Sequence, residues 1–170
     1  MLCLYSLRQF RDADFLCQTE RSLEKRLAGA LPASLRPFAG EFAAASRRYG
    51  VSAVTLASIA GLESDWGRAC PFPNDLFGLR RRGFDRPEQS ISYAAAVLRA
   101  DYLTPGGRCY RGPELEDVGV CFAPGDPGWA AGVRRIMALL LERMRQSLAE
   151  ELIESGFGVR PPSSLPGYVC

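Results

Sequence analysis

Apolar residues recur at steps of three and four along most of the chain, which is the spacing of one face of an α-helix. Alternating apolar and polar positions, the pattern of strands, are nearly absent. The pattern predicts a mainly α fold with at most a small β-hairpin between Leu76 and Phe84. The helices that we expect cover residues 6–31, Leu35–Tyr49, 52–67, 87–104 and Gly128–Ile153, with a short one around Glu114–Val120.

Glycine, proline and capping residues divide these helices. Leu31-Pro32 ends the first pattern, Gly50 supplies a stop, and Ser52 is a typical N-cap for the next helix. We therefore predict an N-terminal helical extension (1–34), one helical main domain (35–153) and a tail rich in proline and glycine (154–170).

One acid lies among apolar neighbours in the third helix. Glu63 follows Leu56 and Ile59 at helical steps, and Trp66 comes three residues later on the same predicted face. Burial disfavours the charged form of a carboxyl and raises its pKa, so that it can hold a proton near neutral pH. A glycosidase needs such a group as its general acid. The competing interpretation is a surface acid at a helix C-terminus, where the helix dipole disfavours negative charge.

Composition removes several other classes of chemistry. The 170 residues, 47% of them hydrophobic, suit one domain, and the net charge of +2 argues against a nucleic-acid binder. The absence of histidine excludes Ser-His-Asp and Cys-His catalysis and histidine-ligated zinc. None of the six cysteines forms a Cys-x-x-Cys pair, so we expect neither a metal nor a cofactor. Cys109 and Cys121 could bridge a loop, but reduced thiols are the favoured interpretation.

Four motifs occur in a suggestive order between Phe38 and Met137: GLESDWGRA, NDLFGLR, DRPEQSISYAAAVL and CFAPGDPGWAAGVRRIM. Together they resemble the endo-β-N-acetylglucosaminidase family of the lysozyme superfamily, which includes flagellar muramidases and autolysins. The resemblance implies a lysozyme-like helical fold and cleavage of peptidoglycan.

By this resemblance the catalytic acid is Glu63, and Trp66 and Phe77 shape the floor of the sugar cleft. Phe122 stands where the family often has a tyrosine whose hydroxyl assists catalysis. Trp129 replaces a second common tyrosine and could stack on a sugar ring.

A second carboxylate is harder to place, because relatives that carry one usually hold it in a longer lobe than this chain has after Leu79. Asp75 and Asp85 are the catalytic candidates, whereas Asp65 points away from Glu63 on a continuing helix. The acetamido group of the substrate could replace such a carboxylate.

The function expected is a peptidoglycan hydrolase that cuts β-1,4 bonds between N-acetylated sugars, acting as a monomer. The alternatives are a lytic transglycosylase and a non-catalytic wall-binding or assembly module of a phage or secretion system.

No apolar run is long enough to cross a membrane, and charges interrupt the N-terminal apolar segment, so no signal peptide is evident. We expect synthesis in the cytoplasm and action on the cell wall, by phage-type release or as part of a secreted parent.

Overall fold

The structure, a computed structural model, describes residues 20–154 of the chain. The predicted helical turns before residue 20 and nearly all of the predicted tail lie outside the described residues. Within them the fold is mainly α, as predicted, and it contains no strand, only an isolated bridge between Phe72 and Asp75. The elements are α2 (Glu20–Ala30), the 3₁₀ turn η1 (Arg36–Phe38), α3 (Ala39–Tyr49), α4 (Ala53–Glu63), α5 (Pro87–Val97), the π-helical turn η2 (Leu98–Tyr102), α6 (Leu115–Phe122) and α7 (Trp129–Glu154).

The predicted stop and start signals between α3 and α4 are confirmed. Gly50 adopts a left-handed conformation with φ of 65°, and its N–H donates to the Ser46 carbonyl at the end of α3. Two residues later the Ser52 hydroxyl accepts a hydrogen bond from the Thr55 N–H at 3.4 Å. These two residues turn the chain between the two helices and set the direction of α4.

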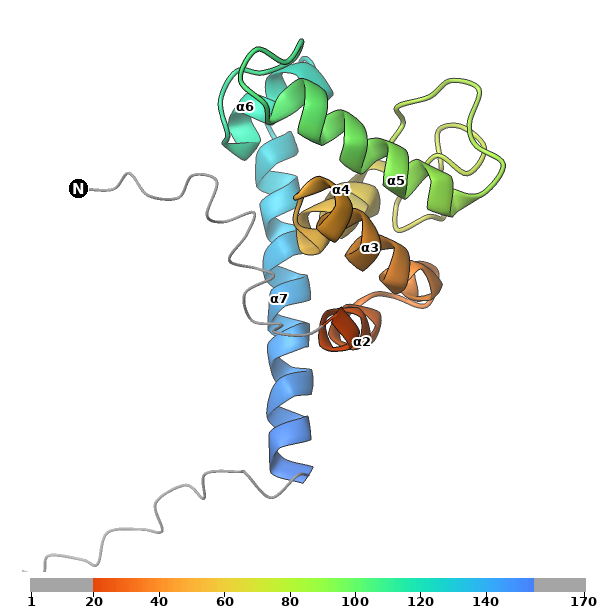
Figure 1. The fold of residues 1–170 in the computed structure, drawn as a ribbon, viewed down its shortest axis with the longest axis vertical. Helices are drawn as coiled ribbons and strands as arrows, with labels where there is room; N and C mark the ends of the chain where they lie inside the picture. The colour runs from red at the N-terminus through yellow and green to blue at the C-terminus, as the bar shows by residue number, and fades with distance from the viewer. Residues whose placement is uncertain (1–19, 155–170) are drawn as a thin grey trace, which may run out of the picture.

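Helix α4 lies at the centre of the fold. Every residue from Val51 to Gly61 is buried, and α4 packs against α3, α5 and α7. Figure 1 shows α7 as one long rod, with α4 and α2 beside it and α6 near its N-terminal end. Because α4 is covered along its length, its C-terminal turn is the part that reaches the surface.

Helix α7 supplies much of the remaining core. Val133 and Leu140 are fully buried and Met144 is nearly so, and these residues lie at steps of seven and four on one face of the helix. The short predicted helix is also present as α6, where the side chains of Glu114 and Asp117 form a reciprocal capping box. The packing of α6 on α7 fixes the loop between them.

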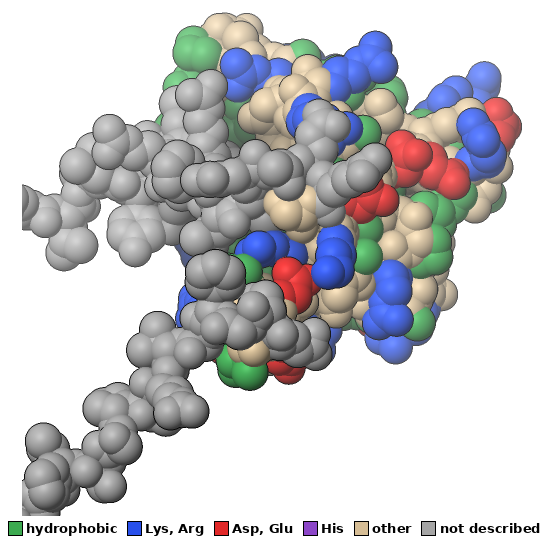
Figure 2. Space-filling view, turned by 60° about the horizontal axis from the view of Figure 1, so that its bottom comes forward, with side chains coloured by type: hydrophobic (Ala, Val, Ile, Leu, Met, Phe, Trp, Pro, Cys, Tyr) green, Lys and Arg blue, Asp and Glu red, His purple; other side chains and the backbone are tan. Residues whose placement is uncertain are grey.

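Figure 2 shows the Lys and Arg side chains of the described residues in several separate groups on the face that it draws. Arg80, Arg81 and Arg82 are exposed, and the Arg80 guanidinium lies 5.2 Å from the centre of the Phe84 ring. In the described part of the chain, no helix combines the length and the apolar character needed to cross a bilayer.

Candidate active site

Glu63 is the last residue of α4, at the point where that buried helix meets solvent. Its backbone is followed by Ser64, whose N–H still bonds the Ala60 carbonyl at 3.1 Å and whose hydroxyl donates to the same oxygen at 2.6 Å. The Glu63 side chain is half-buried. Its Oε1 accepts a 2.6 Å hydrogen bond from the indole Nε1–H of Trp129, the first residue of α7. Glu63 is therefore part of α4 and is bonded by the first residue of α7, which lies 66 residues later in the sequence.

Three influences act on the Glu63 carboxyl. Burial, the largest, raises its pKa, the indole hydrogen bond lowers it, and the negative charge of Asp126 raises it again. The net result is a pKa above the ordinary glutamate value. A larger fraction of Glu63 thus keeps its proton as the pH approaches neutrality, which is what a general acid requires.

The Trp129 indole is the end of a column of aromatic rings. It stacks on Phe122 at a centroid distance of 5.1 Å and an interplanar angle of 29°, and Phe122 contacts Tyr102 at 5.8 Å. Gly119 on α6 makes room for the indole, since a Cβ there would lie 3.0 Å from Trp129 Cε3. These contacts fix the indole plane and hence the direction of the bond to Glu63.

This arrangement corrects the predicted role of Trp129 as a sugar platform. Its side chain is only 2% exposed, so neither face of the ring is open to a pyranose. Phe77 is also buried, at 1% exposed, and belongs to the core rather than to a cleft floor. Phe122 is partly buried between its two aromatic neighbours and carries no hydroxyl for catalysis.

The chain after Glu63 does not continue the helical face that the sequence pattern predicted. Asp65, Trp66 and Gly67 have φ values of 46°, 59° and 81°, so three successive residues lie in the left-handed region. This turn folds the Trp66 indole back over Gly61, where a Cβ would lie 2.8 Å from the ring. Trp66 is partly buried and stays a candidate for contact with substrate.

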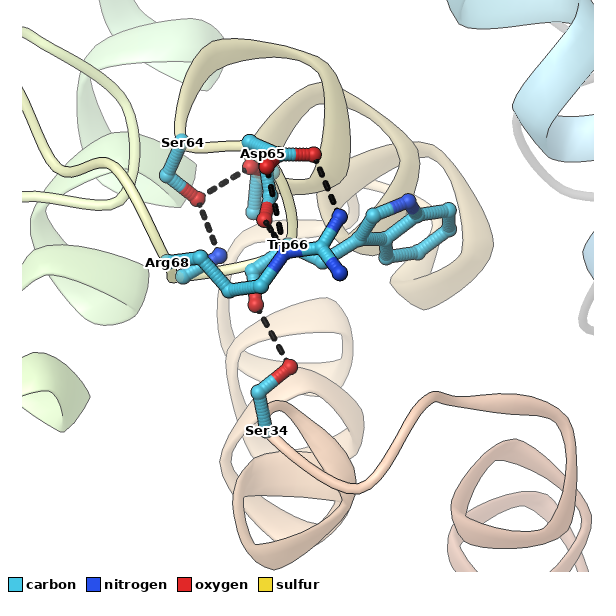
Figure 3. Close-up of polar contacts among 7 residues, drawn as sticks. Ser34, Ser64, Asp65, Trp66 and Arg68 are labelled. Carbon is cyan, nitrogen blue, oxygen red and sulfur yellow. Dashed lines mark hydrogen bonds and ion pairs between the residues drawn. The ribbon is translucent and has the colours of Figure 1, made fainter.

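Hydrogen bonds hold this unusual turn, as Figure 3 shows. The Ser64 hydroxyl accepts from the Gly67 N–H at 2.8 Å, and the Ser34 hydroxyl donates to the Trp66 carbonyl at 2.6 Å. Asp65 forms an exposed ion pair with Arg68, with a separation of 2.7 Å. Strained backbone of this kind persists only where surrounding contacts enforce it, and it clusters at functional sites.

The two predicted catalytic aspartates have different surroundings. Asp75 is fully buried, and its two carboxylate oxygens accept backbone N–H bonds from Phe77 at 3.0 Å and from Arg80 at 2.7 Å. Asp75 therefore holds the loop, and we do not retain it as a base. Asp85 is exposed before α5, where its N–H donates to the Gln89 side chain and its carbonyl accepts from Asn74.

The structure adds a hollow that the sequence motifs did not indicate. It has a volume of about 450 Å³ and lies between α6, the loop that follows it and the start of α7. Glu63 is not part of its wall, but Asp126 is. The sequence motifs assign no role to Asp126, although its Asp-Pro-Gly setting three residues before the first residue of α7 is typical of a side chain held at a helix start.

A disulfide joins Cys109, in the loop after η2, to Cys121 on α6. This corrects the expectation of reduced thiols at these two positions. It ties α6 to the preceding loop one residue before Phe122 and so supports the aromatic column. Among residues 20–154, no group of three or more acidic or cysteine side chains is arranged to hold a metal ion.

Comparison with known proteins gave no further guide. No protein-family model matches the chain, and neither the curated proteins nor the solved structures include a significant match. The family expected from the motifs stays a prediction.

Proposed function

We propose that the chain is a glycosidase that cleaves β-1,4 bonds between the N-acetylated sugars of bacterial peptidoglycan, with Glu63 as its general acid. The observation that carries the proposal is the setting of Glu63. It is half-buried at the end of a rigid helix, its pKa is raised by burial, and Trp129 fixes its orientation. The protonated carboxyl would give its proton to the glycosidic oxygen as that oxygen leaves the sugar.

The surroundings of Glu63 argue against a purely structural role. An acid at a helix C-terminus meets the unfavourable end of the helix dipole, and this one has no ion-pair partner among the described residues. The Cys109–Cys121 disulfide also fits action on a wall outside the cytoplasm, because disulfides persist in oxidising compartments.

Glu63→Gln tests the proposal directly. Glutamine keeps the size of the side chain and an oxygen that can accept from Trp129, but it has no proton to give. Loss of a general acid lowers the rate by about 100- to 10,000-fold. The measurement is clearing of purified cell walls, followed by turbidity, with circular dichroism to check the fold. Glu142→Gln, which removes an exposed carboxylate from α7, is the matched control and should clear walls normally.

The products and the binding of walls separate this proposal from its alternatives. A hydrolase leaves reducing ends, whereas a lytic transglycosylase leaves anhydro ends that are lighter by one water, which mass spectrometry resolves. If the native chain sediments with insoluble walls and never clears them, it is a binding module. If the Glu63→Gln variant clears walls at the native rate, the assignment of the acid is wrong.

A further inference from the structure

The loop between α6 and α7 holds a carboxylate in a defined position. Asp126 is exposed, and its Oδ1 accepts a hydrogen bond from the Gly128 N–H at 2.8 Å. The backbone of Asp126 is held as well, because its N–H donates to the Ala123 carbonyl at 3.1 Å and its carbonyl accepts from the Trp129 N–H. The second carboxylate oxygen, Oδ2, has no hydrogen-bond partner among residues 20–154.

This carboxylate lies on the wall of the hollow between α6 and α7, whose volume of about 450 Å³ is in the range of small-ligand sites. Much of the wall is apolar, from Val120, Pro124 and Pro127. Its other acid, Glu116, is ion-paired with Arg134. Within the described chain, Asp126 is therefore the acid of this hollow that has no cation beside it.

Asp126 is also linked to the catalytic acid. It lies three residues before Trp129, whose indole holds Glu63, so one short segment positions both groups. The negative charge of Asp126 raises the pKa of Glu63. Pairs of carboxyl groups with unequal environments are the usual way in which glycosidases divide acid and base roles.

The other candidates for a second carboxylate are less suitable. Both oxygens of Asp75 are occupied by backbone N–H groups, and Asp65 is paired with Arg68. Asp85 lies before α5, and among residues 20–154 neither a hydrogen bond nor an ion pair joins its side chain to Glu63 or Trp129.

Resting on the function proposed above, we propose that Asp126 is the second carboxylate of the site and acts as the base toward water. Glu63 gives its proton to the glycosidic oxygen, and the bond from that oxygen to the anomeric carbon breaks. A water oxygen bonds the anomeric carbon, and the proton that this water loses passes to Asp126. The hollow accepts the sugar chain next to this carboxylate. Asp126 is thereby a catalytic residue that the sequence motifs did not reveal.

The test compares Asp126→Asn with Asp85→Asn, using a soluble peptidoglycan fragment as substrate. Asparagine still accepts the hydrogen bond from Gly128, so the loop is preserved. We expect Asp126→Asn to lower kcat by at least about 100-fold with little change in KM, and Asp85→Asn to leave both unchanged. A second variant, Asp126→Ala, leaves space for azide, which should restore turnover and give a glycosyl azide detectable by mass spectrometry.

The results separate this proposal from the general one. If Asp126→Asn keeps the native kcat, or if Asp85→Asn alone loses activity, Asp126 is not the base, while loss of activity in Glu63→Gln would still support the glycosidase. The pH dependence of the residual activity of Asp126→Asn gives a second measurement. Removing the negative charge lowers the pKa of Glu63, so the alkaline limb of the pH–rate profile should move to lower pH. An unmoved limb, like a failure of azide rescue in Asp126→Ala, would overturn the proposal.

Discussion

The hydrogen bond from Trp129 to Glu63 can be tested by Trp129→Phe, which keeps a buried aromatic ring and removes the donor. A hydrogen bond to a charged acceptor contributes about 1.5–3 kcal/mol to stability, and one to a neutral acceptor about 0.5–1.5 kcal/mol. The variant should therefore lose about 1 kcal/mol more unfolding free energy at alkaline pH, above the raised pKa of Glu63, than at acidic pH, below the ordinary glutamate value. The smaller ring adds a packing cost that is the same at both pH values.

Urea unfolding at the two pH values measures this difference. Phe122→Leu is the control, because it disturbs the same ring stack without removing a donor, and its cost should not change with pH. Activity gives an independent measurement. Since the indole bond lowers the pKa of Glu63, its loss raises that pKa and should move the alkaline limb of the rate profile to higher pH, opposite to Asp126→Asn. Equal costs at both pH values would refute the bond to the ionised carboxylate.

Three further changes have defined outcomes. The pKa of Glu63 is raised in the folded chain. The contribution of this carboxyl to the free energy of unfolding therefore falls as the pH rises from the ordinary glutamate pKa through the pKa in the folded chain. Glu63→Gln should accordingly be more stable than the native chain at alkaline pH but not at acidic pH, by urea unfolding. Gly61→Ala places a methyl group against the Trp66 ring and should cost about 1–3 kcal/mol, with altered tryptophan fluorescence. Replacing Cys109 and Cys121 with serine should cost about 2–3 kcal/mol, and dithiothreitol should lower the Tm of the native chain alone.

The helix pattern was predictable because its determinants are local. Gly50 and Ser52 act through their own backbone and side-chain bonds to nearby residues. In α7 the buried residues Val133, Leu140 and Met144 recur at helical steps, so their burial follows from the local pattern. The partial burial of Glu63 was predictable for the same reason, because it is an acidic residue among apolar residues of one helix. Its neighbour Trp66 was misplaced because the left-handed turn after α4 depends on bonds to Ser34, which is 32 residues away.

The partners of Glu63 could not be inferred from local sequence. Trp129 contacts the acid across 66 residues, and an aromatic residue at a helix start is equally compatible with an open or a buried ring. Phe77 shows the same ambiguity, since an apolar side chain next to a glycine can cover a cleft or fill the core. A role for Asp126 is not predictable from local sequence, because an aspartate before a helix commonly serves only as a cap. Its charge acts on Glu63 only once α4 and α7 are packed together.

The covered position of α4 has a consequence for heat inactivation. Every residue from Val51 to Gly61, in the helix that carries Glu63 and just before it, is buried by neighbouring elements. This helix therefore cannot unfold unless the whole core opens. Glu63 should therefore keep its position until the protein unfolds globally. The midpoint of thermal inactivation should then coincide with that of global unfolding, in contrast to enzymes whose reactive groups sit on loops that come apart first.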